Sequence, residues 1–266
     1  MVVLVKRENK HKDKGDKDTV ENKKTSSSRM TNTSVFIACF IALIFITGLS
    51  GVVSACETYV LVNPGESIQD AIDSLCPEGG VVELAAGTYY LPQGGTINLT
   101  IHANQKTTLT PIQVEDLPDG THHWIGYKDY KYAIILNEKH NITIRGAGIN
   151  DTILINAINA GESYPEYHMI FIVKGSNNII EDLSIKNNYT GWIPDDAGNG
   201  IKIFGKAENI AISNIKAERF SAGIGAGVTL HVLKEYHAIE NLTVSNCLLT
   251  YNKIGIVGLY LSLIHI

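Results

Sequence analysis

A degenerate repeat in residues 178–258 limits the folds open to this chain more than any other feature. Three eight-residue segments share the pattern apolar, any, Asp or Asn, apolar, any, apolar, any, polar. They begin at Ile180, Ile212 and Ile239, which are 32 and 27 residues apart. Repeats with such a period predict stacked supersecondary units that share one continuous core. We therefore expect the three segments to lie above one another.

The pattern inside each segment predicts strands interrupted by a turn. Apolar residues alternate over short runs, as in half-buried strands. Each run is broken at the same place, by Asp182, Asn214 or Asn241. Asn and Asp tolerate the left-handed backbone conformation and bond to nearby backbone groups. We expect these three side chains to stack and to bond along the stack, with Asn241 inside it and inaccessible.

Strand, sharp turn and strand in every unit predict an all-β parallel β-helix, a single-stranded solenoid. The expected core is one buried column that contains Leu183, Ile215 and Leu242. Replacing Leu183 or Leu242 by Asp should unfold its own and the neighbouring coils. A β-sandwich of short strands is the alternative, but hairpin turn pairs such as Asn-Gly are nearly absent between these strands.

The segment 1–55 differs in composition from the remainder of the chain. Residues 1–34 hold nine Lys or Arg and five acids, have few apolar residues, and are predicted to be disordered. Residues 35–55 form an uncharged apolar segment that fits either a signal peptide or a transmembrane helix. The preceding basic segment predicts a cytoplasmic N-terminus, and 35–53 would anchor the protein to a membrane if uncleaved.

The apolar segment ends in small residues followed by Cys56, which also resembles a lipobox, so signal peptide, anchor and lipoprotein all stay open. In each case the remainder would be exported. Four cysteines without a Cys-x-x-Cys pair give no support to a metal or thioredoxin-like motif. A Cys56–Cys76 disulfide and burial of both residues as small hydrophobes are the two alternatives.

Residues 57–91 carry the strongest family signal. Strand 59–62 is followed by a turn, by Ser67 as an N-cap and by an amphipathic helix over 68–75. A strand, Gly turn and strand over 81–89 come next. This order resembles the opening of pectin-lyase-like right-handed β-helix proteins, in which the helix caps the end of the solenoid. The resemblance covers about residues 57–258 and implies a right-handed β-helix domain over 56–260.

Three segments are predicted to be loops on the side of this domain: 102–131, 157–168 and 188–200. The third contains the best candidates for substrate binding. Aromatic side chains there would stack on sugar rings, and an adjacent pair of acids stands before a Gly-rich turn. The candidates are Tyr189, Trp192, Asp195 and Asp196. Adjacent acids in a strand point to opposite faces, and no Gly-His-Gly or Arg-x-Lys motif accompanies them, so the signature of the related hydrolases and lyases is incomplete.

Other candidate sites are weaker. His122-His123 lacks an evident third ligand, so no metal site is predicted. Asn98 and Asn188 are the better glycosylation acceptors among several Asn-x-Thr patterns. Arg219 fits a polar position of the repeat and is expected to be structural. No cofactor is expected, and calcium is expected only if the protein is a lyase.

The net charge of the chain after residue 34 bears on whether its partner is a nucleic acid. Residues 35–266 hold 13 basic and 22 acidic residues, a net charge of −9, which argues against nucleic acid. The last six residues, 261–266, look foreign, so we expect a truncated product that lacks its final coils.

The sequence therefore predicts an extracellular or cell-surface β-helix protein that binds polysaccharide or other components of the cell envelope. A pectate-lyase-like or polygalacturonase-like enzyme is the alternative. One fold hosts many activities, so fold alone does not choose between them.

Overall fold

The structure of the chain is a computed structural model. It describes residues 56–103, 110–116, 118, 120, 122–157, 167–188, 193, 198–227, 238–258 and 264–265, which all belong to the unit Ala55–Ile266. The segments predicted over 1–34 and 35–55 lie outside this part. No helix within the described part is long and apolar enough to cross a membrane.

The described part is almost entirely β, with one short helix, α2 (Ile68–Ser74). Ten strands form one sheet: β1 (Tyr59–Val62), β2 (Gly80–Leu84), β3 (Gly87–Leu91), β7 (Ile142–Arg145), β8 (Thr152–Asn156), β10 (Ile179–Lys186), β12 (Ala207–Glu218), β14 (Ile239–Ser245), β15 (Leu248–Thr250) and β17 (Ile264–His265). Seven form the other: β4 (Gly95–Ala103), β5 (Thr110–Asp116), β6 (His122–Asn137), β9 (Tyr167–Val173), β11 (Asn199–Phe204), β13 (Ala222–Ala226) and β16 (Ile254–Gly258).

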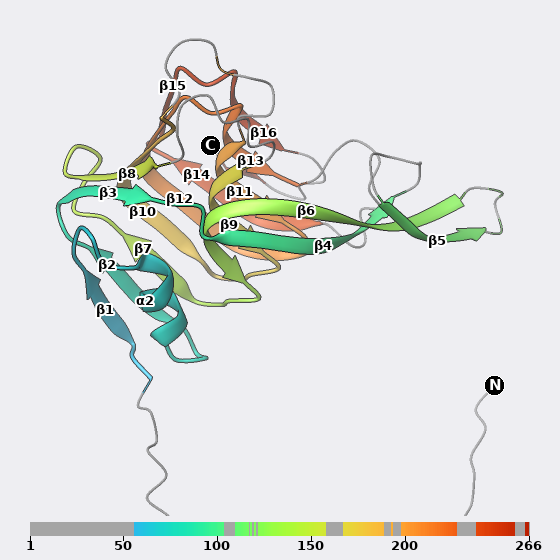
Figure 1. The fold of residues 1–266 in the computed structure, drawn as a ribbon, viewed down its shortest axis with the longest axis horizontal. Coiled ribbons are helices and arrows are strands. Elements are labelled where there is room, and N and C mark those ends of the chain that lie inside the picture. Colours follow the sequence, from blue (N-terminus) through green and yellow to red (C-terminus); the bar gives the residue numbers. More distant parts are fainter. Residues whose placement is uncertain are drawn as a thin grey trace, which may run out of the picture. The chain divides into compact units, whose positions relative to one another are not determined.

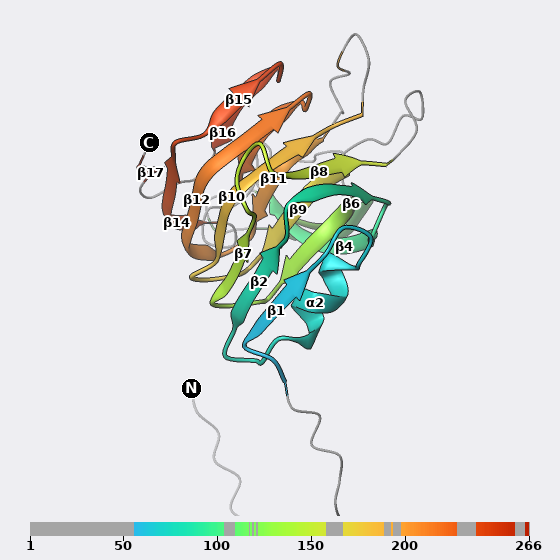
Figure 2. The same cartoon turned by 90° about the vertical axis from the view of Figure 1, so that its left-hand side faces the viewer.

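From β6 onward the chain passes repeatedly from the seven-stranded sheet to the ten-stranded one and back, and we call one such pass a coil. Figure 2 shows strands of the ten-stranded sheet side by side, in the order β1, β2, β7, β10, β12 and β14. These neighbours pair in parallel. The predicted register of the first two repeats is confirmed, because Ile180 pairs with Ile212 and Leu183 with Ile215.

The predicted register of the third repeat is wrong by five positions. Ile239 pairs with Ala207, and Leu242 pairs with Ile210, so the offset is again 32 and not 27. The error has a physical cause. The motif Asn, apolar, any, apolar occurs twice within β12, at Asn209 and at Asn214, and the sequence pattern fits either copy.

The turn residues form two ladders instead of one. Asn177 donates to Asn141, Asn209 to Asn177 and Asn241 to Asn209 through side-chain amides, at 3.0, 3.0 and 2.9 Å. Asn214 donates separately to Asp182 at 2.6 Å. The predicted stacking of Asp182 and Asn214 is therefore confirmed. Asn241 belongs to the other ladder and is exposed, which corrects the expectation that it is inaccessible.

All these ladder residues adopt positive φ, between 51° and 58°. Asn and Asp are the side chains that tolerate this conformation best. The same residues therefore shape the turn and bond from one coil to the next.

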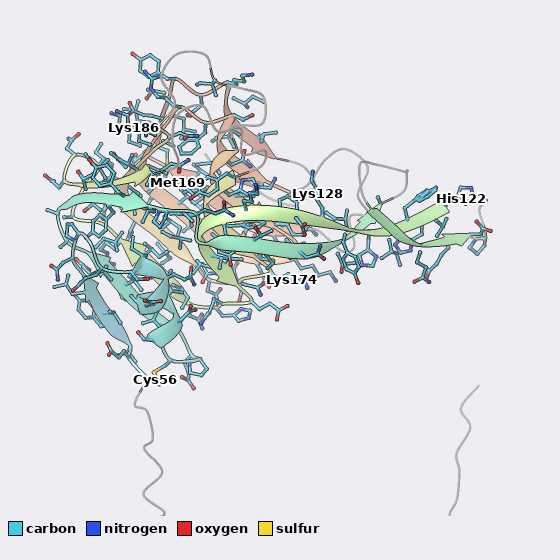
Figure 3. The ribbon with its side chains drawn as sticks, in the orientation of Figure 1. Cys56, His122, Lys128, Met169, Lys174 and Lys186 are labelled. Atoms are coloured by element: carbon cyan, nitrogen blue, oxygen red, sulfur yellow. A yellow bond between two sulfur atoms is a disulfide. The ribbon has the colours of Figure 1, made fainter. Side chains whose placement is uncertain are left out.

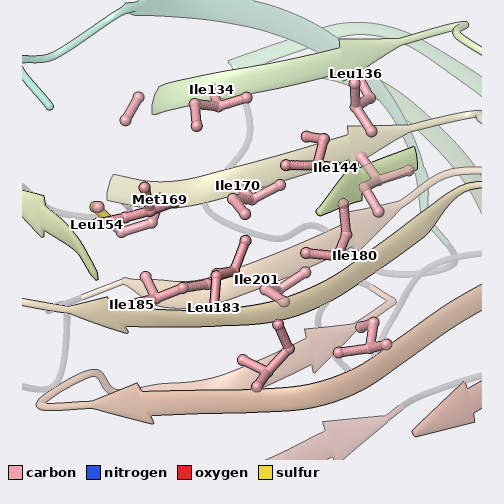
Figure 4. Close-up of a cluster of buried hydrophobic side chains, with 14 of the residues drawn as sticks. Ile134, Leu136, Ile144, Leu154, Met169, Ile170, Ile180, Leu183, Ile185 and Ile201 are labelled. Atoms are coloured by element: carbon pink, nitrogen blue, oxygen red, sulfur yellow. The ribbon is translucent and has the colours of Figure 1, made fainter. Parts of the chain in front are cut away.

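The core lies between the two sheets. Figure 4 shows Ile144, Ile180 and Leu183 projecting toward Ile134 and Ile170 of the other sheet. Leu183, Ile215 and Leu242 are fully buried in this one core. They do not share one column, however, because Leu242 stacks on Ile210. A second apolar cluster contains Leu99, Ile101, Tyr130, Ile135, Phe171, Val173 and Phe204.

The predicted helix is confirmed as α2. Ser67 is the N-cap of α2 and its Oγ accepts from the backbone N–H of Asp70 at 3.1 Å. The side chain of Gln69 accepts from the N–H of Ile135 at 2.9 Å and donates to its carbonyl at 3.3 Å. The helix therefore satisfies backbone groups of β6 that would otherwise be open to another strand. A disulfide joins Cys56 to Cys76, which settles the two alternatives for this pair.

The segment predicted as a loop over 102–131 contains an antiparallel ribbon. β6 pairs with β4 on one edge and with β5 on the other. Figure 1 shows the ribbon extending away from the stacked coils. The prediction of a loop is therefore wrong for the residues that lie in these strands.

Candidate functional site

The structure does not place the predicted substrate-binding residues, because Tyr189, Trp192, Asp195 and Asp196 lie outside the described residues. The two predicted glycosylation acceptors are described and exposed. Asn98 lies on β4, where its side-chain amide donates to Asp129 Oδ1 at 2.7 Å. Asn188 follows the end of β10.

An open cavity of about 580 Å³ lies where the chain leaves the seven-stranded sheet and enters the ten-stranded one. We call this cavity the turn groove. Turns from successive coils build it, so residues far apart in the sequence become neighbours. Its lining residues are His140, Lys174, Gly175, Ser176, Lys206, Ala207, Glu208, Ala238 and Glu240.

A row of polar side chains runs along the groove across four coils. His140 pairs with Ser176, Ser176 pairs with Glu208, and Glu208 pairs with Glu240. His140 Nδ1 and Ser176 Oγ are 2.6 Å apart and share a hydrogen bond. Parallel strands are spaced about 4.8 Å apart, so the groove offers one polar group per coil at that interval.

Two lysines lie beside this row. Lys174 has a φ of 53° in its turn, and its Nζ is 3.5 Å from Glu138 Oε1, an exposed contact. A Cβ at Gly205 would lie 2.8 Å from Lys174 Cγ, so glycine leaves room for the lysine stem. Lys206 follows directly in the next coil. The groove therefore contains cations and carboxylates together.

A buried side-chain amide joins two of the turns beside the groove. Asn178 is fully buried. Its Nδ2 donates to the carbonyl of Lys139 at 3.0 Å, and its Oδ1 accepts from the N–H of Ile142 at 2.9 Å. A Cβ at Gly175 would lie 2.4 Å from Asn178 Nδ2, so only glycine fits. This clamp joins two coils and holds the turns in place.

Outside the groove, a buried histidine has a strongly shifted pKa. The ring of His168 lies 5.8 Å from that of Tyr130 and 5.0 Å from that of Phe171. Burial lowers the pKa of His168 well below its ordinary value of 6.5, and the ammonium groups of Lys202 and Lys128 lower it further. The imidazole is therefore neutral at neutral pH.

The hydrogen bonds of His168 define what it can do. Its Nδ1 accepts from the backbone N–H of Asn199 at 3.3 Å, and its Nε2 has no partner among the residues that the structure describes. A neutral imidazole that accepts at Nδ1 carries its proton on Nε2. His168 can therefore donate a hydrogen bond but cannot accept a proton at Nε2.

Sequence reasoning missed both places. It assigned His168 to a loop, whereas it lies in β9 within a continuous run of buried residues. It did not consider His140, Lys174, Ser176 or Glu208. Their signal was present in the spacing, because the interval from Ser176 to Glu208 equals the interval from Ile180 to Ile212 in the repeat itself.

One group of three metal-ligating side chains is close together in the part of the chain that the structure describes: Cys56, Cys76 and Glu78. Both sulfur atoms are consumed by the disulfide, so this group is not an ion site.

Comparison with known proteins gives structural neighbours but no family. No family model and no curated protein matches the chain. The catalytic domain of a GH87 α-1,3-glucanase in complex with tetrasaccharides is 19% identical, with a TM-score of 0.39 over 71% of this chain and 25% of that chain. The Agl-KA catalytic domain is 15% identical, with a TM-score of 0.40 over 65% of this chain and 23% of that one.

A rhamnogalacturonan lyase is 14% identical, with a TM-score of 0.35 over 73% of this chain and 56% of that chain. The chain spans about a quarter of the length of the first two neighbours. Every one of these scores is below 0.5, so the comparisons carry no argument about fold or activity.

Proposed function

We propose that the protein is an exported right-handed parallel β-helix that binds polysaccharide along its turn groove. The fold part rests on three observations. Strands of successive coils pair in parallel, and the offset is 32 residues both for Ile180 with Ile212 and for Ile210 with Leu242. One core fills the space between the sheets, and α2 covers one end. Right-handed connections between parallel strands are strongly preferred, which gives the handedness.

The row of polar groups across four coils is the observation that carries the binding proposal. A polymer of similar units needs a surface that repeats, and the row His140, Ser176, Glu208 and Glu240 repeats with the coil. The Asn178 clamp holds the turns rigid, so little conformational entropy is lost when a ligand binds. The groove is open, as a chain that passes through it requires.

The groove presents two ammonium groups and two carboxylates, so it suits a polysaccharide that carries both carboxylates and free hydroxyls. Lys174 and Lys206 can bind carboxylates, whereas Glu208 and Glu240 accept hydrogen bonds from sugar hydroxyls. The lysines lie in adjacent coils, so carboxylates on successive sugars would each meet one.

Affinity electrophoresis and calorimetry on polygalacturonate, with an uncharged galactan for comparison, test this assignment. Removing two exposed charge contacts, each worth up to about 1 kcal/mol, should weaken polygalacturonate binding by roughly tenfold in Lys174→Ala with Lys206→Ala. Lys186→Ala is the matched control, because Lys186 is exposed at the far end of β10 (Figure 3). Equal binding by the double variant and the wild type would refute the groove as the site.

A polyuronate-cleaving lyase or hydrolase is the second candidate function. One observation favours it: Glu208 and Glu240 are paired in register, and like charges directly opposite each other destabilise a sheet unless they serve a purpose. Two close carboxylates can act as acid and base. Product formation from pectate or alginate, with and without calcium, that is abolished in Glu208→Gln with Glu240→Gln would establish it. Loss on Asp195→Ala with Asp196→Ala would place the chemistry there instead.

Export to the extracellular space or cell surface is part of the proposal. Its support is the Cys56–Cys76 disulfide, because disulfides persist in oxidising compartments, together with the apolar segment 35–53. Envelope partners, membrane attachment and glycosylation of Asn98 and Asn188 belong to the same proposal. Protease accessibility on intact cells and a mass shift after glycosidase treatment test them.

A further inference from the structure

Two histidines and a glutamate share one face of the antiparallel ribbon. Glu115 of β5 lies directly opposite His123 of β6, and His102 of β4 lies opposite Ile125. Opposite residues share a face, and residues two apart on a strand share it as well. Each of the three strands therefore contributes one metal-ligating type of side chain to the same face.

The ring nitrogens on this face converge. His102 Nδ1 and His123 Nε2 are 3.0 Å apart, and the rings are tilted by 35° with centroids 5.1 Å apart. Two nitrogen ligands on one zinc ion, each at about 2.0–2.1 Å, are roughly 2.9–3.4 Å apart for angles between 90° and the tetrahedral value. The observed separation is within this interval.

The second nitrogen of His123 has the partner that a ligating imidazole normally has. Glu115 Oε2 is 3.3 Å from His123 Nδ1. A carboxylate at this nitrogen fixes its proton there and leaves the Nε2 lone pair for a metal. His123 is 6% exposed, whereas the Glu115 side chain is 46% exposed, so the imidazole is held among its neighbours while solvent reaches the edge of the site.

We propose that His102 Nδ1 and His123 Nε2 bind a divalent transition-metal ion of the zinc type, with Glu115 as the residue that orients His123. Imidazole ligands select such ions over calcium and magnesium, which prefer oxygen. Water molecules would complete the coordination.

The same three residues could instead share a hydrogen bond, with His102 donating to His123 and His123 to Glu115. This arrangement satisfies the groups without an ion. The two arrangements differ in one measurable respect, since only the first binds zinc with an affinity that depends on both histidines.

The ribbon provides its own control. His122 and Asp116 are adjacent in sequence to His123 and Glu115 and are paired in the same way, with Nδ1 2.7 Å from Oδ1. They lie on the opposite face, and His122 is exposed near the tip of the ribbon in Figure 3. If zinc bound to any exposed histidine–acid pair, His122→Gln would therefore lose zinc affinity as well.

The test is calorimetric titration of the full chain with zinc chloride after removal of metals by EDTA. We expect one ion per chain at the tight site, a loss of at least tenfold in affinity in His102→Gln and in His123→Gln, and no change in His122→Gln. Glu115→Gln should weaken binding by about 10- to 100-fold, as for other carboxylates that orient a ligating imidazole. Calcium and magnesium chloride should produce no heat at this site.

Two further measurements keep the test decisive if a variant folds poorly. Circular dichroism in EDTA identifies a folding defect, and the visible spectrum of cobalt(II) bound to the wild-type chain reports nitrogen coordination without any substitution. Absence of a tight zinc site in the wild type, or equal loss in His122→Gln, overturns the proposal and leaves the hydrogen-bonded pair.

Discussion

Truncation of Leu183 tests the packing of the coils quantitatively. Leu183 is fully buried in the core between the sheets and pairs with Ile215 of the next coil. Leu183→Ala removes three buried carbon groups at about 0.8 kcal/mol each, or roughly 2.4 kcal/mol of transfer free energy. The cavity left between two rigid sheets raises the expected loss in the free energy of unfolding to about 3–4 kcal/mol.

Urea unfolding followed by circular dichroism measures this loss, and Leu61→Ala provides the matched control. Leu61 is 51% exposed on β1, so the same substitution there should cost about 1 kcal/mol or less. The pairing register also predicts that two paired residues are energetically coupled. Leu183→Ala and Ile215→Val should depart from additivity by about 0.5 kcal/mol or more, because these two residues pair across adjacent coils.

By contrast, Leu183→Ala and Leu242→Ala should add to within about 0.5 kcal/mol, because β10 and β14 are two coils apart. Equal costs for Leu183→Ala and Leu61→Ala, or strong coupling between Leu183 and Leu242, would refute the packing described above.

Three further predictions concern the polar groups. Burial keeps His168 neutral in the folded state, with its pKa below 6.5, so below pH 6.5 the unfolded state binds a proton that the folded state does not. The stability that His168 contributes is therefore complete above pH 6.5 and decreases below it, by at most about 1.4 kcal/mol per pH unit. His168→Gln should flatten the dependence of the urea midpoint on pH between 6.5 and 5, and an unchanged slope would contradict this. Asn178→Ala leaves the buried N–H of Ile142 without its acceptor and should lower the free energy of unfolding by about 1–3 kcal/mol. An unchanged free energy of unfolding would show that Asn178 does not hold these turns together. Reducing Cys56–Cys76, which closes a 20-residue separation, should lower the free energy of unfolding by about 3 kcal/mol. Equal thermal midpoints for the oxidised chain and for the chain with both thiols reduced would contradict this.

Local chemistry explains how much of the fold the sequence could predict. Alternating apolar residues and turn-forming Asn predicted the strands and the first register, and Ser67 with the amphipathic spacing after it predicted the helix. Each of these signals is contained in a few adjacent residues. The offset of 27 failed because Asn209 and Asn214 both satisfy the motif within one strand. Only pairing across coils distinguishes the two copies, and a single sequence contains no direct record of it.

The candidate site shows the same limit. His140, Ser176, Glu208 and Glu240 have different side chains, so no motif connects them. They form a row because parallel pairing aligns their turns. The ribbon was missed for a related reason: antiparallel pairing of β4 with β6 brings His102 to His123, and sequence inspection considered only the adjacent His122-His123 pair.

Disulfide trapping between β12 and β14 tests the central claim, which is that each coil stacks on the next with Glu208 beside Glu240 and Ile210 beside Leu242. In a Cys39→Ser and Cys247→Ser background, Glu208→Cys with Glu240→Cys should cross-link under mild oxidation, because paired residues on adjacent strands have Cα atoms within the disulfide range of about 4.4–6.8 Å. Ser213→Cys with Glu240→Cys, which the register expected from the sequence pattern would align, should stay reduced. Cross-linking of the second pair but not the first would contradict the account.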